Sequence, residues 1–238
     1  LDIQGGTVAV ADIDGDRFGI VDYKGRFLKS DILMPPLIEY LIMARKMEGG
    51  VVKSISSTQN IRWVAEYYKR PVYSTPVGFK YLAKKLLTKD AFIGVESSNG
   101  AALNQTVKIK DGILFSLLIS EMLAYYRRDM DKILEDFYRR FPHLYSHEIV
   151  VPINDHTRER FENLISKQCT PMSFGSLKLK KVELTDGIKF RFDDCWLLLR
   201  QSGTNPVYRI YAESTSMKQT KALVKMGHSF IESFSKHD

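Results

Sequence analysis

Residues 8–22, VAVADIDGDRFGIVD, place three aspartates within five positions. The apolar residues on either side predict two strands, over 6–11 and 17–22, joined by this acidic loop. Three neighbouring carboxylates repel one another unless they hold a positive charge. Hard divalent ions such as Mg²⁺ prefer carboxylate oxygens, and Gly15 lets the loop turn so that alternate side chains converge. The pattern favours a metal site over a solvated acidic turn. Its expected ligands are Asp12, Asp14 and Asp16.

Two familiar kinds of acidic loop do not fit this stretch. A calcium-binding EF-hand loop requires Gly at its sixth position and Glu at its twelfth, where this chain has Arg17 and Tyr23. A haloacid-dehalogenase phosphatase has D-x-D-G-T after an apolar strand, and here Asp16 stands in place of the threonine. The pattern that remains is D-x-D-G-D-R.

The composition is that of a globular protein. The 238 residues are 44% hydrophobic and 26% charged, which predicts two packed domains and a piece of a third. No apolar run is long enough to span a membrane, and no signal-peptide pattern is present. The chain begins with leucine, so we expect residue 1 not to be the native start. Neither Cys169 nor Cys195 belongs to a metal or disulfide pattern, so we expect core thiols and a reducing, cytoplasmic setting.

The chain is basic, with a net charge of +7 and an isoelectric point of about 9.2. Nucleic-acid-binding proteins often have such values. Here the basic pairs are scattered, mostly on predicted amphipathic helices, where solvated faces explain them. A basic surface also attracts small anions. We therefore expect a phosphorylated metabolite as the partner, and neither a nucleic acid nor a membrane. The pairs are Lys84–Lys85, Arg127–Arg128, Arg139–Arg140 and Lys180–Lys181.

Hydrophobic periodicity divides the chain into three parts. Residues 1–48 contain the acidic loop, its two strands and one helix. In residues 49–145 strands alternate with helices, which predicts a mixed α/β three-layer domain with a parallel core. Residues 146–238 contain close strands around an Asp-Gly turn, which predicts a smaller α+β domain with an antiparallel sheet. Segments expected between or within these elements are a turn at 23–26, a polar loop after residue 96 up to Gln105, a linker at 142–147 and one strand over 177–184.

Four further motifs follow the D-x-D-G-D-R loop. They are TPVGFK (75–80), GVESSNG (94–100), KDGI (110–113) and RQSGTNPVYRIYAES (200–214). In this order, the five stretches resemble the signatures of the α-D-phosphohexomutases, the phosphoglucomutase/phosphomannomutase family. The resemblance extends over nearly the whole chain, and its last motif, R-x-S-G-T-x-P-x-x-R, is fairly specific by itself.

The resemblance implies a role for each motif. The three aspartates would hold Mg²⁺, and Arg17 would lie near the phosphoryl group that is transferred. Lys80 matches a family lysine near the active site, although a solvated helix lysine is the alternative. Glu96 and Ser98 match residues that hydrogen-bond sugar hydroxyls, although Glu96 could also be a surface carboxylate at a strand end.

The last motif has the groups that a dianionic phosphate requires. Arg200 can bind two phosphate oxygens with its guanidinium fork, and Arg209 on the next strand can add a second fork. Gly203 lets backbone N–H groups approach the anion. The hydroxyl groups of Ser202 and Thr204 complete the expected set. A loop that merely caps a strand is the alternative, which the two flanking arginines disfavour.

The resemblance also implies parts that residues 1–238 do not contain. Complete members have four domains, and the first carries a phosphorylated serine in a T-A-S-H-N-P loop that this chain lacks. We therefore expect a C-terminal half that is inactive alone, with an N-terminal half bearing the catalytic serine as its partner. The complete enzyme would be an isomerase that interconverts hexose 1-phosphate and hexose 6-phosphate through a phosphoserine and a bisphosphate intermediate.

The sugar is not identified by these residues. Val95 and Asn99 replace glycines that are usual in the family's sugar loop. Phosphoglucosamine mutase is one alternative, although its loop usually reads G-E-Q-S-G. A non-catalytic module that binds sugar phosphates is another.

Overall fold

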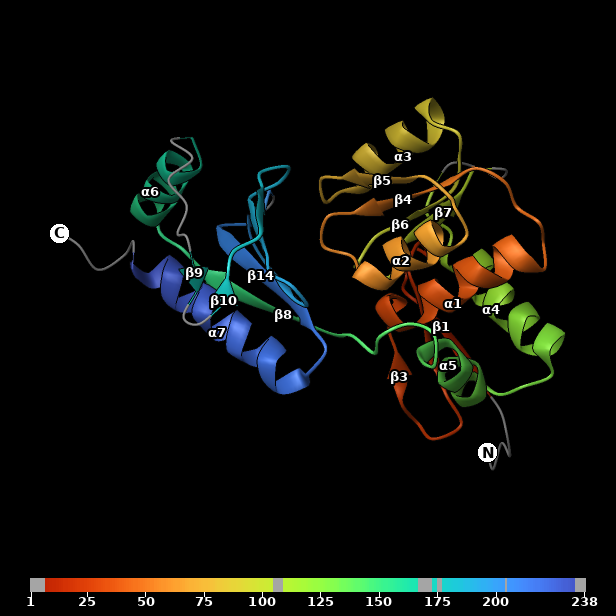
Figure 1. The fold of residues 1–238 in the computed structure, drawn as a ribbon. Helices are drawn as coiled ribbons and strands as arrows, with labels where there is room; N and C mark the ends of the chain where they lie inside the picture. Colours follow the sequence, from red (N-terminus) through yellow and green to blue (C-terminus); the bar gives the residue numbers. More distant parts are fainter. Residues whose placement is uncertain (1–6, 105–108, 167–172, 175–176, 204, 234–238) are drawn as a thin grey trace. The chain divides into compact units, whose positions relative to one another are not determined.

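The computed structural model describes residues 7–104, 109–166, 173–174, 177–203 and 205–233 (Figure 1). The chain forms two compact units, residues 1–142 and 143–238. The domain boundaries expected after residues 48 and 145 stay predictions.

The first unit begins with a small antiparallel sheet in the order β1-β2-β3. The acidic loop joins β1 (Val8–Ala11) to β2 (Phe18–Val21), as the sequence predicts. The predicted turn leads into β3 (Phe27–Leu28), a two-residue strand too short for the sequence pattern to indicate. The Phe18 ring stacks on Phe115 with centroids 5.7 Å apart, so this sheet packs against the longer helices of the unit.

The main sheet of the first unit has the order β5-β4-β6-β7. Three strands are parallel, as predicted: β4 (Gly50–Ser54), β5 (Val72–Thr75) and β6 (Ala91–Val95). The fourth strand, β7 (Ala101–Leu103), is antiparallel to β6 and occupies the segment expected to be a polar loop. That expectation is wrong there because Ala101, Ala102 and Leu103 are buried against β6.

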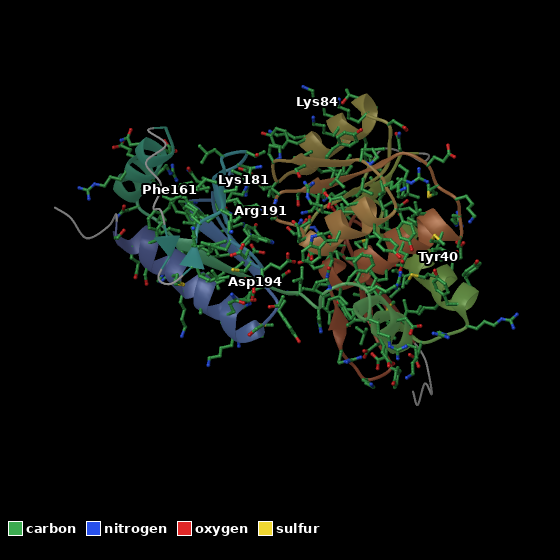
Figure 2. The ribbon with its side chains drawn as sticks, viewed as in Figure 1. Tyr40, Lys84, Phe161, Lys181, Arg191 and Asp194 are labelled. Carbon is green, nitrogen blue, oxygen red and sulfur yellow. The ribbon has the colours of Figure 1, made fainter. Side chains whose placement is uncertain are left out.

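Helices cover both faces of this sheet, which gives the predicted three layers (Figure 1). On one face, Leu82 and Leu86 of α3 (Phe79–Thr88) pack on Val52 and Ala102. The other face carries the larger core, which includes the buried Tyr40 marked in Figure 2. Its helices are α1 (Ser30–Met43), α2 (Gln59–Tyr67), α4 (Gly112–Tyr126) and α5 (Met130–Tyr138).

The second unit is built on an antiparallel sheet in the order β11-β12-β13-β14-β8, as predicted. Its strands are β8 (Tyr145–Pro152), β11 (Lys181–Glu183), β12 (Ile188–Arg191), β13 (Trp196–Gln201) and β14 (Val207–Ser214). One face packs on α6 (Asp155–Ser166) and α7 (Met217–Ser233), with Phe161 of α6 in that core (Figure 2). Cys195 belongs to the same core, as expected, and Cys169 lies outside the described residues.

Two expectations for this unit need correction. The linker predicted up to residue 147 ends earlier, because β8 already pairs at Tyr145 with Ser214. The single strand predicted over 177–184 is divided between β10 (Leu177–Lys178) and β11, and β10 pairs instead with β9 (Ser173–Phe174). Within the part of the chain that the structure describes, no helix is long and apolar enough to cross a bilayer.

Candidate functional site

Polar loops gather where the parallel strands of the first unit end. In open α/β sheets, ligands bind outside the carboxyl ends of the strands, where such loops meet. The loop after β4 contains the buried Ser56, and the loop after β6 contains Ser97. Their hydroxyl oxygens share a hydrogen bond of 2.6 Å, so the two loops are tied together. This edge is where the candidate site of the first unit lies.

The acidic loop brings its three aspartates together. Asp12, Asp14 and Asp16 each offer a carboxylate oxygen, and these oxygens lie within 4.8 Å of one another. The loop is closed by Gly15, whose N–H donates to the carbonyl oxygen of Asp12 across 3.1 Å. The N–H of Arg17 donates to Oδ1 of Asp12 across 3.0 Å, which lowers the pKa of that carboxyl group. The three carboxylates are thus held close together by the backbone of one short loop.

The donor set suits a hard divalent cation. The Oδ1 atom of Asp16 is buried and accepts no hydrogen bond from the described residues. Nε of Arg17 lies 3.5 Å from this atom, and the same Nε lies 3.6 Å from Oδ2 of Asp12. Carboxylate oxygens that are close together and incompletely paired are the ligands that Mg²⁺ prefers.

Lys110 is a residue that sequence analysis did not single out. Its Nζ forms an ion pair with Oδ2 of Asp16, and its charge opposes the rise in the pKa of Glu96 that burial causes. A Cβ added to Gly100 would lie 2.6 Å from Cδ of Lys110 and 3.2 Å from Oε2 of Glu96. Lys110 therefore lies between the acidic loop and the loop after β6. Its sequence signal is the KDGI motif, in which the next residue, Asp111, caps α4 by accepting from the Leu114 N–H.

Glu96 is buried at the end of β6, so it is no surface carboxylate. Burial raises the pKa of Glu96, while Lys110 and a hydrogen bond from the Gly78 backbone lower it, and burial outweighs them. Because Gly78 precedes α3, this contact also ties the TPVGFK segment to the loop after β6. The two motifs are therefore adjacent in space as well as similar to family signatures.

Asn99 shows how the family's usual glycine can be replaced. Its φ of 66° lies in the left-handed region, which asparagine tolerates better than most residues. Its Oδ1 accepts a hydrogen bond of 2.9 Å from the Ser30 N–H at the start of α1. Its carbonyl oxygen accepts one of 3.1 Å from the Phe18 N–H. The residue thus keeps the glycine-like turn and anchors it to α1 and β2.

Ser98 and Lys80 are less constrained. Ser98 is exposed in the loop between Glu96 and Asn99, where its hydroxyl can reach a ligand. Lys80 is exposed near the start of α3, and its Nζ lies over the Tyr81 ring, 4.9 Å from the centroid. The role expected for Lys80 stays a prediction.

The phosphate-loop candidate lies in the second unit. Arg200 of β13 and Arg209 of β14 stand opposite each other in the sheet. Ser202 is buried, its Oγ accepts from the Asn205 N–H across 3.3 Å, and its own N–H donates to the Val207 carbonyl oxygen across 2.9 Å. A Cβ added to Gly203 would have open space around it, so its backbone is accessible. Thr204 lies outside the described residues.

Family models match both units of the chain. The model for phosphoglucomutase/phosphomannomutase, alpha/beta/alpha domain III, matches residues 29–141, and that for the phosphoglucomutase/phosphomannomutase C-terminal domain matches residues 167–226. The chain belongs to the α-D-phosphohexomutase family. The resemblance stated from the sequence motifs is confirmed.

Individual relatives extend the match along most of the chain. A phosphoglucomutase/phosphomannomutase of Thermococcus kodakarensis is 26% identical over 93% of this chain and 46% of its own length. A phosphoglucomutase of Komagataeibacter xylinus is 31% identical over 85% of this chain and 40% of its own length. A phosphoglucosamine mutase of Methanocaldococcus jannaschii is 26% identical over 93% of this chain and 47% of its own length. The chain spans about half the length of the curated relatives it matches.

Solved structures of the family share the fold. A protein from Thermus thermophilus with a provisional phosphomannomutase assignment superposes with a TM-score of 0.78 and 26% identity, over 97% of this chain and 47% of that one. A phosphoglucomutase/phosphomannomutase family protein from Burkholderia thailandensis has a TM-score of 0.76 at 19% identity, over the same shares. The mixed α/β fold class expected from the sequence is therefore confirmed.

Proposed function

We propose that this chain forms the sugar-binding and phosphate-binding part of an α-D-phosphohexomutase. The complete enzyme would interconvert hexose 1-phosphate and hexose 6-phosphate through a phosphoserine and a bisphosphate intermediate. The observation that carries the proposal is the convergence of three aspartates and the buried Glu96 on either side of Lys110. A solvated acidic turn has no need of a neighbouring buried carboxylate, whereas a site for a phosphorylated sugar uses both.

The acidic loop would hold Mg²⁺ through Asp12, Asp14 and Asp16. When bound, Mg²⁺ would neutralise negative charge that develops on a transferring phosphoryl group. Arg17 would add a guanidinium at the same place, since its Nε already lies within 3.6 Å of two of these carboxylates. These groups accelerate phosphoryl transfer by electrostatic stabilisation and need not form covalent bonds to the substrate.

The remaining site residues would bind the substrate. Glu96 would accept hydrogen bonds from sugar hydroxyls, and Ser98 would add a hydroxyl from the exposed part of the same loop. Arg200, Ser202 and Arg209 would bind the phosphate that does not react. Binding energy spent on that remote phosphate orients the reacting end of the sugar.

The catalytic serine would come from outside residues 1–238, which contain no T-A-S-H-N-P loop. The first strand supports a covering partner, because β1 lies at the edge of its sheet and all four of its residues are exposed. Its apolar side chains include Val8, 48% exposed, and Val10, 43% exposed. An exposed apolar edge strand is a ready site for a further strand. The proposal predicts no turnover of glucose 1-phosphate by residues 1–238 alone.

The sugar is left open between two candidates. The names of the relatives support a phosphoglucomutase/phosphomannomutase and, as a second candidate, a phosphoglucosamine mutase. A non-catalytic sugar-phosphate-binding module is a third candidate, and an N-terminal partner segment carrying T-A-S-H-N-P would favour a mutase over it. We keep the reducing, cytoplasmic setting expected from the two cysteines as part of the proposal.

Calorimetric titration of the chain tests the proposal. Glucose 6-phosphate, mannose 6-phosphate and glucosamine 6-phosphate are compared with free glucose. We expect at least one phosphate to bind and free glucose not to bind. Arg200→Ala should weaken binding by about 1.5–3 kcal/mol, the range for hydrogen bonds to charged groups.

Arg191→Ala is the matched control for this substitution. It removes an arginine that pairs with Glu183 in the same sheet, away from the phosphate loop. Binding that is equal in the Arg200→Ala variant and the unmodified chain would contradict the phosphate-loop assignment.

A further inference from the structure

Two arginines face each other on one side of the five-stranded sheet. Arg200 and Arg209 are direct partners in the antiparallel pairing of β13 with β14. The residues next to them, Leu199 and Ile210, belong to the core that packs on α7. Because side chains alternate along a strand, both arginines lie on the opposite face. Like charges directly opposite one another destabilise a sheet, so each arginine needs a compensating partner.

Each arginine forms an ion pair with a carboxylate, and the two ion pairs differ in how exposed they are. Nε of Arg200 donates to Oδ2 of Asp186 across 2.5 Å, and the two side chains are 14% and 20% exposed. Nη1 of Arg209 donates to Oε1 of Glu148 across 2.7 Å, and these two side chains are 36% and 39% exposed. Exposed ion pairs contribute little because water screens them, whereas a sheltered charge-assisted hydrogen bond holds its geometry more firmly. Arg200 is therefore the more fixed of the two.

Arg200 donates to Asp186 through Nε, and this choice of nitrogen affects how it can bind a phosphate. A guanidinium has five N–H donors, and its two Nη groups form the fork that binds two oxygens of one phosphate. Within the described residues, the hydrogen bond of Arg200 is made through Nε. The Nη fork is thus left for an incoming anion.

The backbone fixes Asp186 beside this arginine. Asp186 and Gly187 lie in the hairpin turn between β11 and β12, where Gly187 has a φ of +79°. A Cβ added to Gly187 would lie 2.2 Å from the Leu199 carbonyl oxygen and 2.9 Å from Cα of Arg200. The turn therefore packs directly on the backbone that carries Arg200, and the carboxylate has little freedom to move away.

We propose that Asp186 is a positioning residue for phosphate recognition. It holds Nε of Arg200 so that the Nη fork stays ready for the phosphate of the substrate. Glu148, the exposed partner of Arg209, has no such role. This inference rests on the proposed function, because it requires that Arg200 binds phosphate.

Binding measurements on the full 238-residue chain test the proposal. Inorganic phosphate and glucose 6-phosphate are titrated into the unmodified chain and into D186A, D186N, E148A and R200A. We expect D186A to bind about tenfold more weakly, the size of one charge-assisted hydrogen bond. D186N should stay within about threefold of the unmodified chain, because its amide oxygen still accepts from Nε. E148A should lose nothing.

The opposite result for D186A would overturn the proposal. If Asp186 merely competes with phosphate for Arg200, then D186A and D186N both bind more tightly than the unmodified chain. Equal binding by D186A also excludes positioning. A failure of the proposed function gives a result distinct from a failure of the Asp186 proposal. In that case the unmodified chain and R200A bind phosphate equally, or neither binds it.

A nuclear magnetic resonance measurement tests the proposal without a ligand, and it does not require D186A to fold. The Nε–H group of Arg200 gives its own ¹H–¹⁵N resonance, assigned as the one lost in R200A. We expect this resonance to show a rigid bond vector in the unmodified chain and in D186N, and the Nε–H of Arg209 to be mobile. A mobile Arg200 Nε–H in the unmodified chain would overturn the proposal even if D186A did not fold.

Discussion

The backbone N–H of Gly112, the first residue of α4, donates to the carbonyl oxygen of Gly15 across 2.8 Å. A Cβ added to Gly112 would lie 2.3 Å from the Arg17 carbonyl oxygen and 2.9 Å from that of Gly15. The acidic loop therefore rests directly on the first turn of α4. Any side chain at this position would push the two apart.

Substitution of this glycine should disturb both stability and metal binding. We expect Gly112→Ala to lower the free energy of unfolding by about 1–3 kcal/mol, as overpacking does elsewhere. We also expect weaker Mn²⁺ binding, because the displaced backbone carries Asp16 and Arg17. Urea denaturation and a Mn²⁺ titration followed by electron paramagnetic resonance measure the two effects.

Gly25→Ala is the control for that substitution. Gly25 has a φ of +74°, and a Cβ there would meet nothing within 4 Å. Alanine at this position adds backbone strain without contacting the acidic loop, so stability should fall while Mn²⁺ affinity stays unchanged. Unchanged Mn²⁺ affinity in Gly112→Ala as well would show that the loop does not depend on its contact with α4.

Removal of the charge at Lys110 should tighten cation binding. The ammonium group of Lys110 pairs with Asp16, one of the expected ligands, and so opposes a cation there. We expect Lys110→Met to bind Mn²⁺ about three- to tenfold more tightly, the effect of removing one partly screened charge. Lys110→Arg keeps the charge and should bind as the unmodified chain does. Weaker binding by Lys110→Met would mean that the lysine organises the loop instead of competing with the ion.

Local patterns were sufficient for much of the fold and of the site. The strands around the acidic loop and the parallel strands β4, β5 and β6 follow from short apolar runs with clear turn residues between them. The three aspartates converge because they lie in a single short loop, which needs no tertiary information. Asp186–Gly187 was likewise identified as a hairpin turn from its two residues.

Local sequence patterns did not predict the features that depend on residues distant in the sequence. The strand Ala101–Leu103 is three residues long, and it is defined by its pairing with β6 and not by any periodicity of its own. Lys110 resembles any lysine before a helix until the acidic loop is placed against α4. The pairing of Arg200 with Asp186 depends on the register of β12 against β13, which no local signal specifies.

The left-handed turn at Asn99 gives a prediction with an internal control. Asn99→Gly keeps the backbone conformation and removes the hydrogen bond to the Ser30 N–H, at a cost of about 0.5–1.5 kcal/mol. Asn99→Ala removes the same bond and adds about 1 kcal/mol of strain for a left-handed residue with a Cβ. Urea denaturation should therefore rank the unmodified chain first, Asn99→Gly second and Asn99→Ala third. Equal stability of the two variants would show that the backbone relaxes out of the left-handed region.

The buried Glu96 should make stability depend on pH with a defined sign. Burial raises the pKa of Glu96 above its ordinary value of 4.5, so the folded chain binds this proton more tightly than the unfolded chain does. The resulting stabilisation is fully present below the ordinary pKa and is lost as pH rises through the raised value. Other carboxyl groups, such as Asp22 and Asp131, have lowered pKa values and act in the opposite direction. Total stability against pH would mix these effects, so only a difference between two chains isolates Glu96.

Glu96→Gln provides that difference, because it replaces the carboxyl group with a neutral amide of the same shape. We expect the free energy of unfolding of Glu96→Gln, minus that of the unmodified chain, to increase as pH rises from 4 to 7. Urea denaturation of both chains at several pH values measures it. Glu121→Gln is the control, because a hydrogen bond from Arg45 lowers the pKa of Glu121 and the same difference should then fall as pH rises. A difference that stays constant with pH would mean that Lys110 and the Gly78 backbone balance burial, and a difference that falls would mean that they outweigh it.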